Sequence, residues 1–79
     1  MTRLRLFGAA RRAAGTASLD VPGHTVADVL AGAVARHGPA LAEVLGTSQV
    51  WVNGEPAGGD RTVGPGDEVA VLPPFGGGQ

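Results

Sequence analysis

Residues 25–39 read TVADVLAGAVARHGP, and they carry the clearest helix signal in the 79-residue chain. Thr25 is a favoured N-cap residue, and Asp28 places an acid in the first turn, where it complements the helix dipole. Gly38 followed by Pro39 is a strong stop signal. Apolar residues recur between these ends at helical spacing and form one stripe: Val26, Val29, Leu30, Ala33 and Val34. The segment therefore predicts one amphipathic helix that must cover an apolar surface.

Two strands are expected before this helix. The alternation of Leu4 and Leu6 with arginines predicts a strand over residues 2–7, and a second alternation predicts one over residues 16–21. Between them, residues 9–14 favour a helix but are too few to be stable alone. The two strands and their connection predict a hairpin.

Three further strands are expected after the helix. Residues 39–45 predict one short helical turn, and residues 50–52 predict a strand that ends at an Asn-Gly turn. Residues 55–66 are rich in glycine and proline and leave room for only a short strand. Residues 67–72 alternate again and predict the final strand.

The order strand, strand, helix, strand, short strand, strand is typical of an α+β fold. The last strand can lie in the centre of the sheet, beside the first. We therefore predict a β-grasp (ubiquitin-like) fold, a mixed sheet of about four to five strands with one main helix packed across it. The length fits one domain, which we place at residues 1–73, followed by a flexible Gly-rich C-terminal tail at residues 74–79.

The composition argues against several classes of function. A formal net charge of -1 gives no electrostatic affinity for nucleic acids or acidic membranes. The chain has no cysteine, which excludes a thiolate metal site and a cysteine nucleophile. His24 and His37 are isolated, so we expect no metal site and no catalysis by the chain itself. No signal peptide or membrane-spanning run is recognisable, and we expect a cytoplasmic protein.

Five short motifs follow one another along nearly the whole chain. They are Leu6-Phe7-Gly8-Ala9-Ala10-Arg11, Thr25-Val26-Ala27-Asp28-Val29-Leu30, Val52-Asn53-Gly54-Glu55, Gly66-Asp67-Glu68-Val69 and Leu72-Pro73-Pro74-Phe75-Gly76-Gly77-Gly78. In this order they resemble the small subunit of molybdopterin synthase, a member of the sulfur-carrier branch of ubiquitin-like proteins. The sulfur carriers of thiamine biosynthesis share the tail but are usually shorter and lack the Phe-Gly-Ala-Ala loop, so they resemble this chain less closely.

The resemblance implies a carrier whose C-terminal glycine carboxylate is adenylated and then converted to a thiocarboxylate. It places the reacting carbonyl at Gly78, with Gly76, Gly77, Pro73 and Pro74 as the thread that enters a partner's active site. Glycines lack a Cβ and fit a narrow channel, and the two prolines stiffen the exit from the sheet. A tail of this kind acts as a co-substrate or as a non-catalytic subunit, so we do not expect an enzyme.

The resemblance also implies the partners. An adenylating enzyme related to ubiquitin-activating enzymes would supply ATP and magnesium, so this chain binds no cofactor itself. A sulfur donor and a larger synthase subunit complete the set. Contact in this family uses an apolar sheet face beside the tail, which assigns Phe7, Leu72 and Phe75 to partner binding. Arg11, expected in the loop after the first strand, would pair with acidic groups. Trp51 alternates with two valines, and the pattern leaves open whether it is core or interface.

The chain departs from the family at its last residue, because Gln79 follows Gly78 and ties up its carboxylate in a peptide bond. Three interpretations follow: a protease removes Gln79, the activating enzyme accepts it, or the chain is a ubiquitin-like interaction module without acyl chemistry. We favour processing on chemical grounds. A carrier for cysteine, thiamine or a sulfur-containing natural product is the alternative within the same chemistry, and Gln79 slightly favours a dedicated pathway with its own protease.

Overall fold

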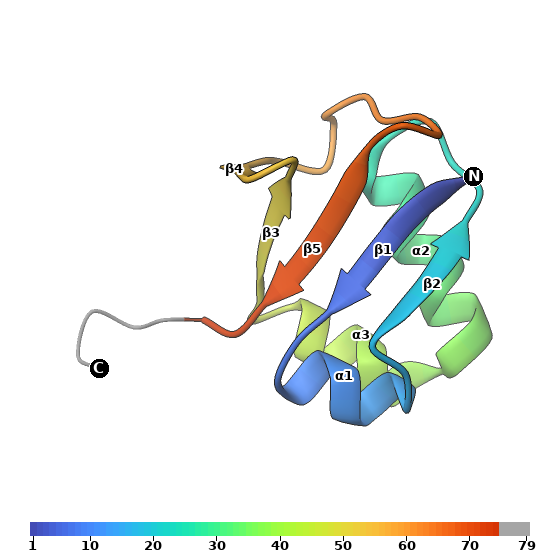
Figure 1. The fold of residues 1–79 in the computed structure, drawn as a ribbon. Coiled ribbons are helices and arrows are strands. Elements are labelled where there is room, and N and C mark those ends of the chain that lie inside the picture. Colours follow the sequence, from blue (N-terminus) through green and yellow to red (C-terminus); the bar gives the residue numbers. More distant parts are fainter. Residues whose placement is uncertain (75–79) are drawn as a thin grey trace.

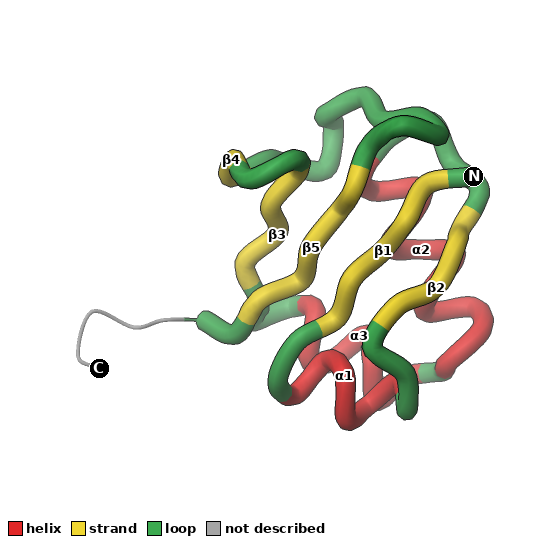
Figure 2. The backbone as a smooth tube through the Cα atoms, in the orientation of Figure 1, coloured by secondary structure: helices red, strands yellow, loops and turns green. Residues whose placement is uncertain are grey.

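The computed structural model describes residues 1–74 and shows a single sheet with three helices (Figure 1). The helices lie on one face of the sheet and around one of its ends, which leaves the other face uncovered (Figure 2). The elements in chain order are β1 (Thr2–Leu6), α1 (Ala9–Ala14), β2 (Ser18–Val21), α2 (Val26–His37), α3 (Pro39–Leu45), β3 (Gln49–Val52), β4 (Glu55–Pro56) and β5 (Glu68–Leu72).

The sheet has the mixed topology that the sequence predicts. Its strand order is β2-β1-β5-β3-β4. The central strands β1 and β5 run parallel, with Leu4 opposite Val69 and Leu6 opposite Val71. β2 pairs with β1 and β3 with β5, both antiparallel. The first and last strands therefore lie side by side in the centre, with α2 across the sheet, and this arrangement is the β-grasp fold.

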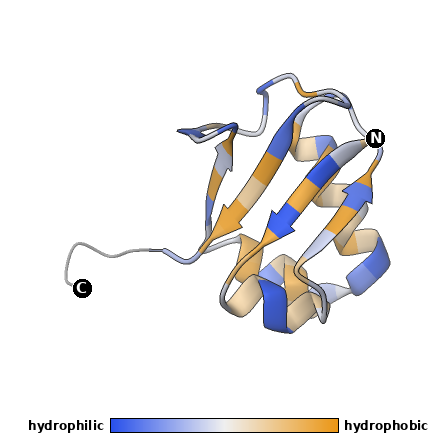
Figure 3. Ribbon diagram, in the orientation of Figure 1, coloured by the Kyte–Doolittle hydropathy of each residue, from blue (hydrophilic) through white to orange (hydrophobic). Residues whose placement is uncertain are grey.

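The core lies between the sheet and α2. Alternate residues of each strand face the helices, so every second residue of β1 and β5 is buried. Figure 3 shows the resulting alternation of hydrophobic and hydrophilic residues along β1. Within residues 1–74, the buried hydrophobic residues are Leu4, Leu6, Ala10, Val21, Val26, Val29, Ala33, Leu41, Val52, Val63, Val69 and Val71.

The ends of α2 confirm the expected signals. The Thr25 Oγ1 accepts a hydrogen bond from the Asp28 amide at 3.2 Å. In the other direction, the Asp28 carboxylate accepts from the His24 amide at 3.1 Å. Asp is shorter than the Glu of a full capping box, and it bonds one residue further upstream. Gly38, with a φ of +89°, ends the helix and donates its amide to the Val34 carbonyl at 2.7 Å.

Residues 9–14 do form a helix, although they are too few to hold one alone. Ala10 is only 1% exposed, and α1 packs beside α3. Tertiary burial therefore supplies the stability that the short segment lacks.

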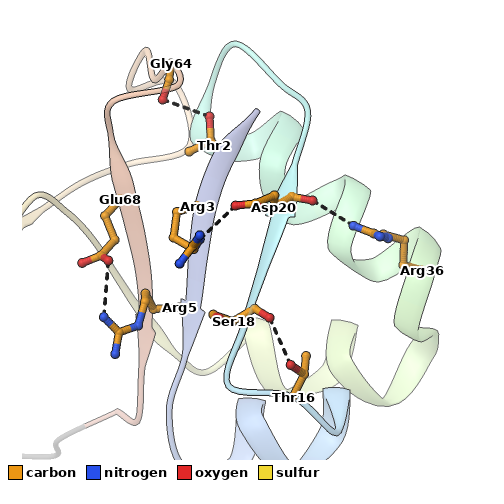
Figure 4. A network of polar contacts seen from close by, with 9 residues as sticks. All are labelled: Thr2, Arg3, Arg5, Thr16, Ser18, Asp20, Arg36, Gly64 and Glu68. Atoms are coloured by element: carbon orange, nitrogen blue, oxygen red, sulfur yellow. Dashed lines mark hydrogen bonds and ion pairs between the residues drawn. The ribbon is translucent and has the colours of Figure 1, made fainter.

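Two side chains occupy carbonyl groups on the free edge of β2. Ala17 accepts a hydrogen bond from the Leu6 amide, so by alternation the carbonyls of Ser18 and Asp20 point away from β1. The Thr16 hydroxyl donates to the Ser18 carbonyl at 3.0 Å, and Arg36 donates to the Asp20 carbonyl at 2.9 Å (Figure 4). The opposite edge ends in β4, where Pro56 has no N–H to offer.

The protein should lose stability in acid, because two carboxylates accept hydrogen bonds in the folded state. The side-chain amide of Asn53 and the Gly64 amide donate to Asp67, and they lower the pKa of Asp67. The His24 amide lowers the pKa of Asp28 in the same way. A carboxyl group with a lowered pKa stabilises the fold at pH values above its unfolded pKa of about 3.9, and this contribution is lost as the pH falls through the lowered value.

We therefore expect the free energy of unfolding, measured with urea, to fall steadily below about pH 4. Asp28→Asn and Asp67→Asn should each flatten that decline. Asp60→Asn is the control, because Asp60 accepts none of the side-chain hydrogen bonds found within residues 1–74. An acid profile unchanged in both variants would contradict the assignment.

Candidate functional site

The C-terminal tail leaves the sheet where its two central strands end. Because β1 and β5 are parallel, both finish at the same end of the sheet, and the N-terminus lies at the opposite end (Figure 1). The Phe7 amide donates to the Val71 carbonyl at 3.1 Å and extends the β1–β5 ladder by one bond. Pro73 is half-buried and Pro74 is exposed. The candidate site is therefore the uncovered sheet face at this end.

An apolar patch occupies that face beside the tail. Trp51 pairs with Ala70 across β3 and β5, and Leu72 is the last residue of β5. These positions alternate with the buried Val52, Val69 and Val71, so their side chains point to the uncovered face. Phe7 continues the outward side of β1 and is 38% exposed. We call these four residues, Phe7, Trp51, Ala70 and Leu72, the apolar patch.

Charged residues fill the other half of the face. Arg3 pairs with Asp20 at 2.9 Å, and Arg5 pairs with Glu68 at 3.4 Å (Figure 4). The guanidinium of Arg5 also lies 5.6 Å from the centre of the Phe7 ring, a cation–π contact. Exposed ion pairs of this kind add little stability. These charged residues lie next to the apolar patch and limit its extent.

The structure brings two of the predicted partner-binding residues together. Phe7 directly follows β1 and Leu72 ends β5, and both lie on the same face where the two central strands end. The expected position of Arg11 was wrong: it lies within helix α1 rather than in a loop, because α1 is stabilised by packing, and its side chain is exposed. Phe75, Gly76, Gly77, Gly78 and Gln79 lie outside the described residues, so their assigned roles stay predictions.

The structure adds Arg5 to the site and decides the position of Trp51, which the sequence pattern left open between core and interface. Trp51 is half-buried on the uncovered face, and its indole N–H donates to the Gln49 side chain at 3.2 Å. The alternation with its flanking valines was the available signal. Arg5 has the same parity as Phe7, but its contact with the ring depends on side-chain conformation, which the sequence pattern does not specify.

Residues 1–74 contain no enclosed pocket, and no three His, Asp or Glu side chains among them stand close enough to hold a metal ion. None of the helices formed by these residues is long and apolar enough to cross a membrane.

A five-stranded mixed sheet crossed by one main helix and ending in a central strand that carries a tail defines the β-grasp, ubiquitin-like class. Within this class, the sequence profile of the ThiS family matches residues 4–78. The chain belongs to the ThiS family, and its fold is that of the ubiquitin-like sulfur carriers.

Solved structures share this fold. The small archaeal modifier protein 1 of Methanosarcina acetivorans is 28% identical, with a TM-score of 0.85 over 94% of this chain and 92% of its own. The BexX/CysO complex of Amycolatopsis orientalis contains a chain 22% identical, with a TM-score of 0.81 over 96% and 98%. A molybdopterin converting factor subunit 1 described for Pyrococcus furiosus is 24% identical, with a TM-score of 0.73 over 94% and 97%. A comparison with curated proteins found no match.

Proposed function

We propose that this protein is a sulfur carrier that is adenylated and thiocarboxylated at Gly78, after removal of Gln79, and that donates sulfur in molybdopterin biosynthesis. One observation carries the proposal beyond family membership. The apolar patch lies on the uncovered sheet face at the end where β5 runs into the tail. A partner that docks on the patch therefore holds the body of the carrier next to the origin of the tail.

The chemistry needs little from the body itself. An oxygen of the Gly78 carboxylate would attack the α-phosphorus of ATP, forming an acyl-adenylate and releasing pyrophosphate. A sulfur donor at the oxidation level of sulfide would then attack the carbonyl carbon, and AMP would leave with the electron pair of the broken C–O bond. The thiocarboxylate sulfur then attacks an electrophilic carbon of the acceptor and displaces its leaving group. Water hydrolyses the resulting acyl–sulfur bond, which restores the Gly78 carboxylate and leaves the sulfur on the acceptor. The activating partner supplies ATP and magnesium.

Docking explains how a carrier whose residues 1–74 enclose no pocket can still be specific. Aromatic and aliphatic side chains dominate the energy of protein interfaces when they become buried. The apolar patch offers two aromatic rings, Phe7 and Trp51, and the aliphatic Leu72, with Arg5 at its border. We propose that the adenylating enzyme and the larger synthase subunit use this same patch in turn, in the cytoplasm, and that the carrier acts as a co-substrate rather than as a catalyst.

The test is the mass of the tail after activation. The form ending at Gly78, incubated with the host's adenylating enzyme, ATP and sulfide, should gain the mass that replaces one carboxylate oxygen by sulfur. The same form carrying Gly78→Ala should gain none, because its Cβ would obstruct a channel shaped for glycine. Full sulfur transfer by the Ala variant would contradict the carrier proposal.

Gln79 favours a second candidate within the same chemistry. A tail that needs trimming suggests a dedicated pathway with its own protease, as for a carrier that serves cysteine, thiamine or natural-product synthesis. The acceptor decides between the two candidates: the thiocarboxylate should convert a pterin precursor with the larger synthase subunit, or else sulfurate another acceptor. Persistence of intact Gln79 in host cells would instead support an interaction module without acyl chemistry.

A further inference from the structure

Gly8 and Pro73 contact each other at the base of the tail, although 64 residues separate them in the chain. A Cβ on Gly8 would lie 2.8 Å from Cγ of Pro73, closer than side chains tolerate. The Pro73 ring therefore packs where any other residue at position 8 would place its first side-chain atom. Local sequence patterns do not predict this contact, because the two residues lie in segments far apart in the chain.

The backbone at Gly8 requires glycine for a second reason. Its φ of +59° and ψ of −128° correspond to the first central residue of a type II′ turn, a conformation that glycine adopts and other residues avoid. This turn takes the chain from the end of β1 into α1. Gly8 thus serves the turn and at the same time leaves room for the proline ring.

The contact restricts the direction in which the backbone leaves the sheet at the start of the tail. The Phe7 amide holds the Val71 carbonyl, so the chain is fixed up to two residues before Pro73. Pro73 then restricts its own φ to about −65°, and its ring is held against Gly8. We propose that Gly8 is a positioning residue: with Pro73 it forms a seat that sets the direction in which the tail leaves the sheet. This inference rests on the proposed carrier function.

Direction matters because the reacting group has a short reach. Residues 74–78 span at most about 17 Å when fully extended. When a partner is docked on the apolar patch, the Gly78 carboxylate reaches the partner's active site only if the tail leaves the sheet in that direction. Loss of the seat should spare docking and reduce the fraction of bound carriers that react, which lowers kcat more than it raises KM.

Pyrophosphate exchange catalysed by the host's adenylating enzyme measures both constants, with each carrier variant ending at Gly78. Pro73→Gly removes the ring and should lower kcat about tenfold, with KM changed less, while the melting temperature stays close to that of the parent. Gly8→Ala should lower kcat similarly and also lower the melting temperature, because of its positive φ.

Gly15→Ala is the matched control. Gly15 closes α1 at the other end with a φ of +75°, and a Cβ there would meet nothing within 4 Å. This variant should lose stability through backbone strain and keep its kcat. The double variant Gly8→Ala/Pro73→Gly should recover part of the stability of Gly8→Ala without recovering kcat, since the clash is gone but the seat is gone too.

Hydrogen exchange of the Phe7 amide provides a readout that does not depend on activation. Exchange should accelerate in Pro73→Gly by more than its change in stability accounts for, and in Gly15→Ala only as far as its lost stability predicts. If the parent carrier supports no pyrophosphate exchange, the proposed function fails, and the amide measurement still decides whether the seat exists. Parental kcat in Pro73→Gly, or an unchanged Phe7 amide, would overturn the inference.

Discussion

Removal of Gln79 is expected to raise the rate of adenylation by about 100-fold, the cost of a small misplacement of a reacting group. In the proposed mechanism the reacting carboxylate is that of Gly78, and in the 79-residue chain this group is part of a peptide bond. The free carboxylate of Gln79 lies one residue further along and carries a side chain with a Cβ and an amide. Pyrophosphate exchange with the two forms of the chain, at equal concentrations, measures the difference.

Gln79→Gly separates the two causes. It keeps the extra residue and removes its side chain. If the side chain obstructs the channel, this variant should react nearly as fast as the form ending at Gly78. If the position of the carboxylate decides, it should remain as slow as the parent. Equal rates for the intact and shortened chains would contradict the need for processing.

Leu4→Ala is expected to destabilise the fold by about 2–5 kcal/mol. Leu4 is fully buried at the centre of β1, between Leu19 on β2 and Val69 on β5. Its removal leaves a cavity among strands that the helices hold in place. The whole stability of a small domain is about 5–15 kcal/mol, so a substantial fraction of the variant should be unfolded at elevated temperature. Urea denaturation measures the loss.

Leu72→Ala is the matched variant on the other face of the sheet. It removes the same atoms from the end of β5, where Leu72 is only half-buried. We expect it to cost less than about 1.5 kcal/mol and to weaken binding of the adenylating enzyme, measured by calorimetry. If Leu72→Ala destabilised the chain as strongly as Leu4→Ala, the patch would belong to the core and not to an interface.

Local sequence signals predict the main helix and the central strands of this protein well. The cap at Thr25, the stop at Gly38 and the alternation in β1 and β5 are all properties of neighbouring residues, and the structure confirms each of them. The same alternation places Leu72 and Trp51 on the uncovered face. Once the strand order is known, the alternation of buried and exposed residues is enough to place these two members of the apolar patch.

Long-range contacts account for what the sequence pattern missed. α1 exists because it packs beside α3, and this contact moved Arg11 from an expected loop into a helix. From the sequence, Gly8 is only a residue that ends the first strand. The structure shows that it also leaves room for the Pro73 ring. Such contacts depend on how elements dock, and spacing within a segment carries no information about docking.

The hydrogen bonds from Thr16 and Arg36 to the edge of β2 bear on how this protein behaves when it is abundant. The apolar patch is exposed on the uncovered sheet face, and two copies can meet through its side chains. If an open strand edge were also available, such encounters could grow into continuous sheets. With the outward carbonyls of Ser18 and Asp20 already occupied, this edge offers fewer free acceptors for pairing with a strand of another copy. The apolar patch can therefore stay exposed with a lower tendency toward sheet growth from that edge.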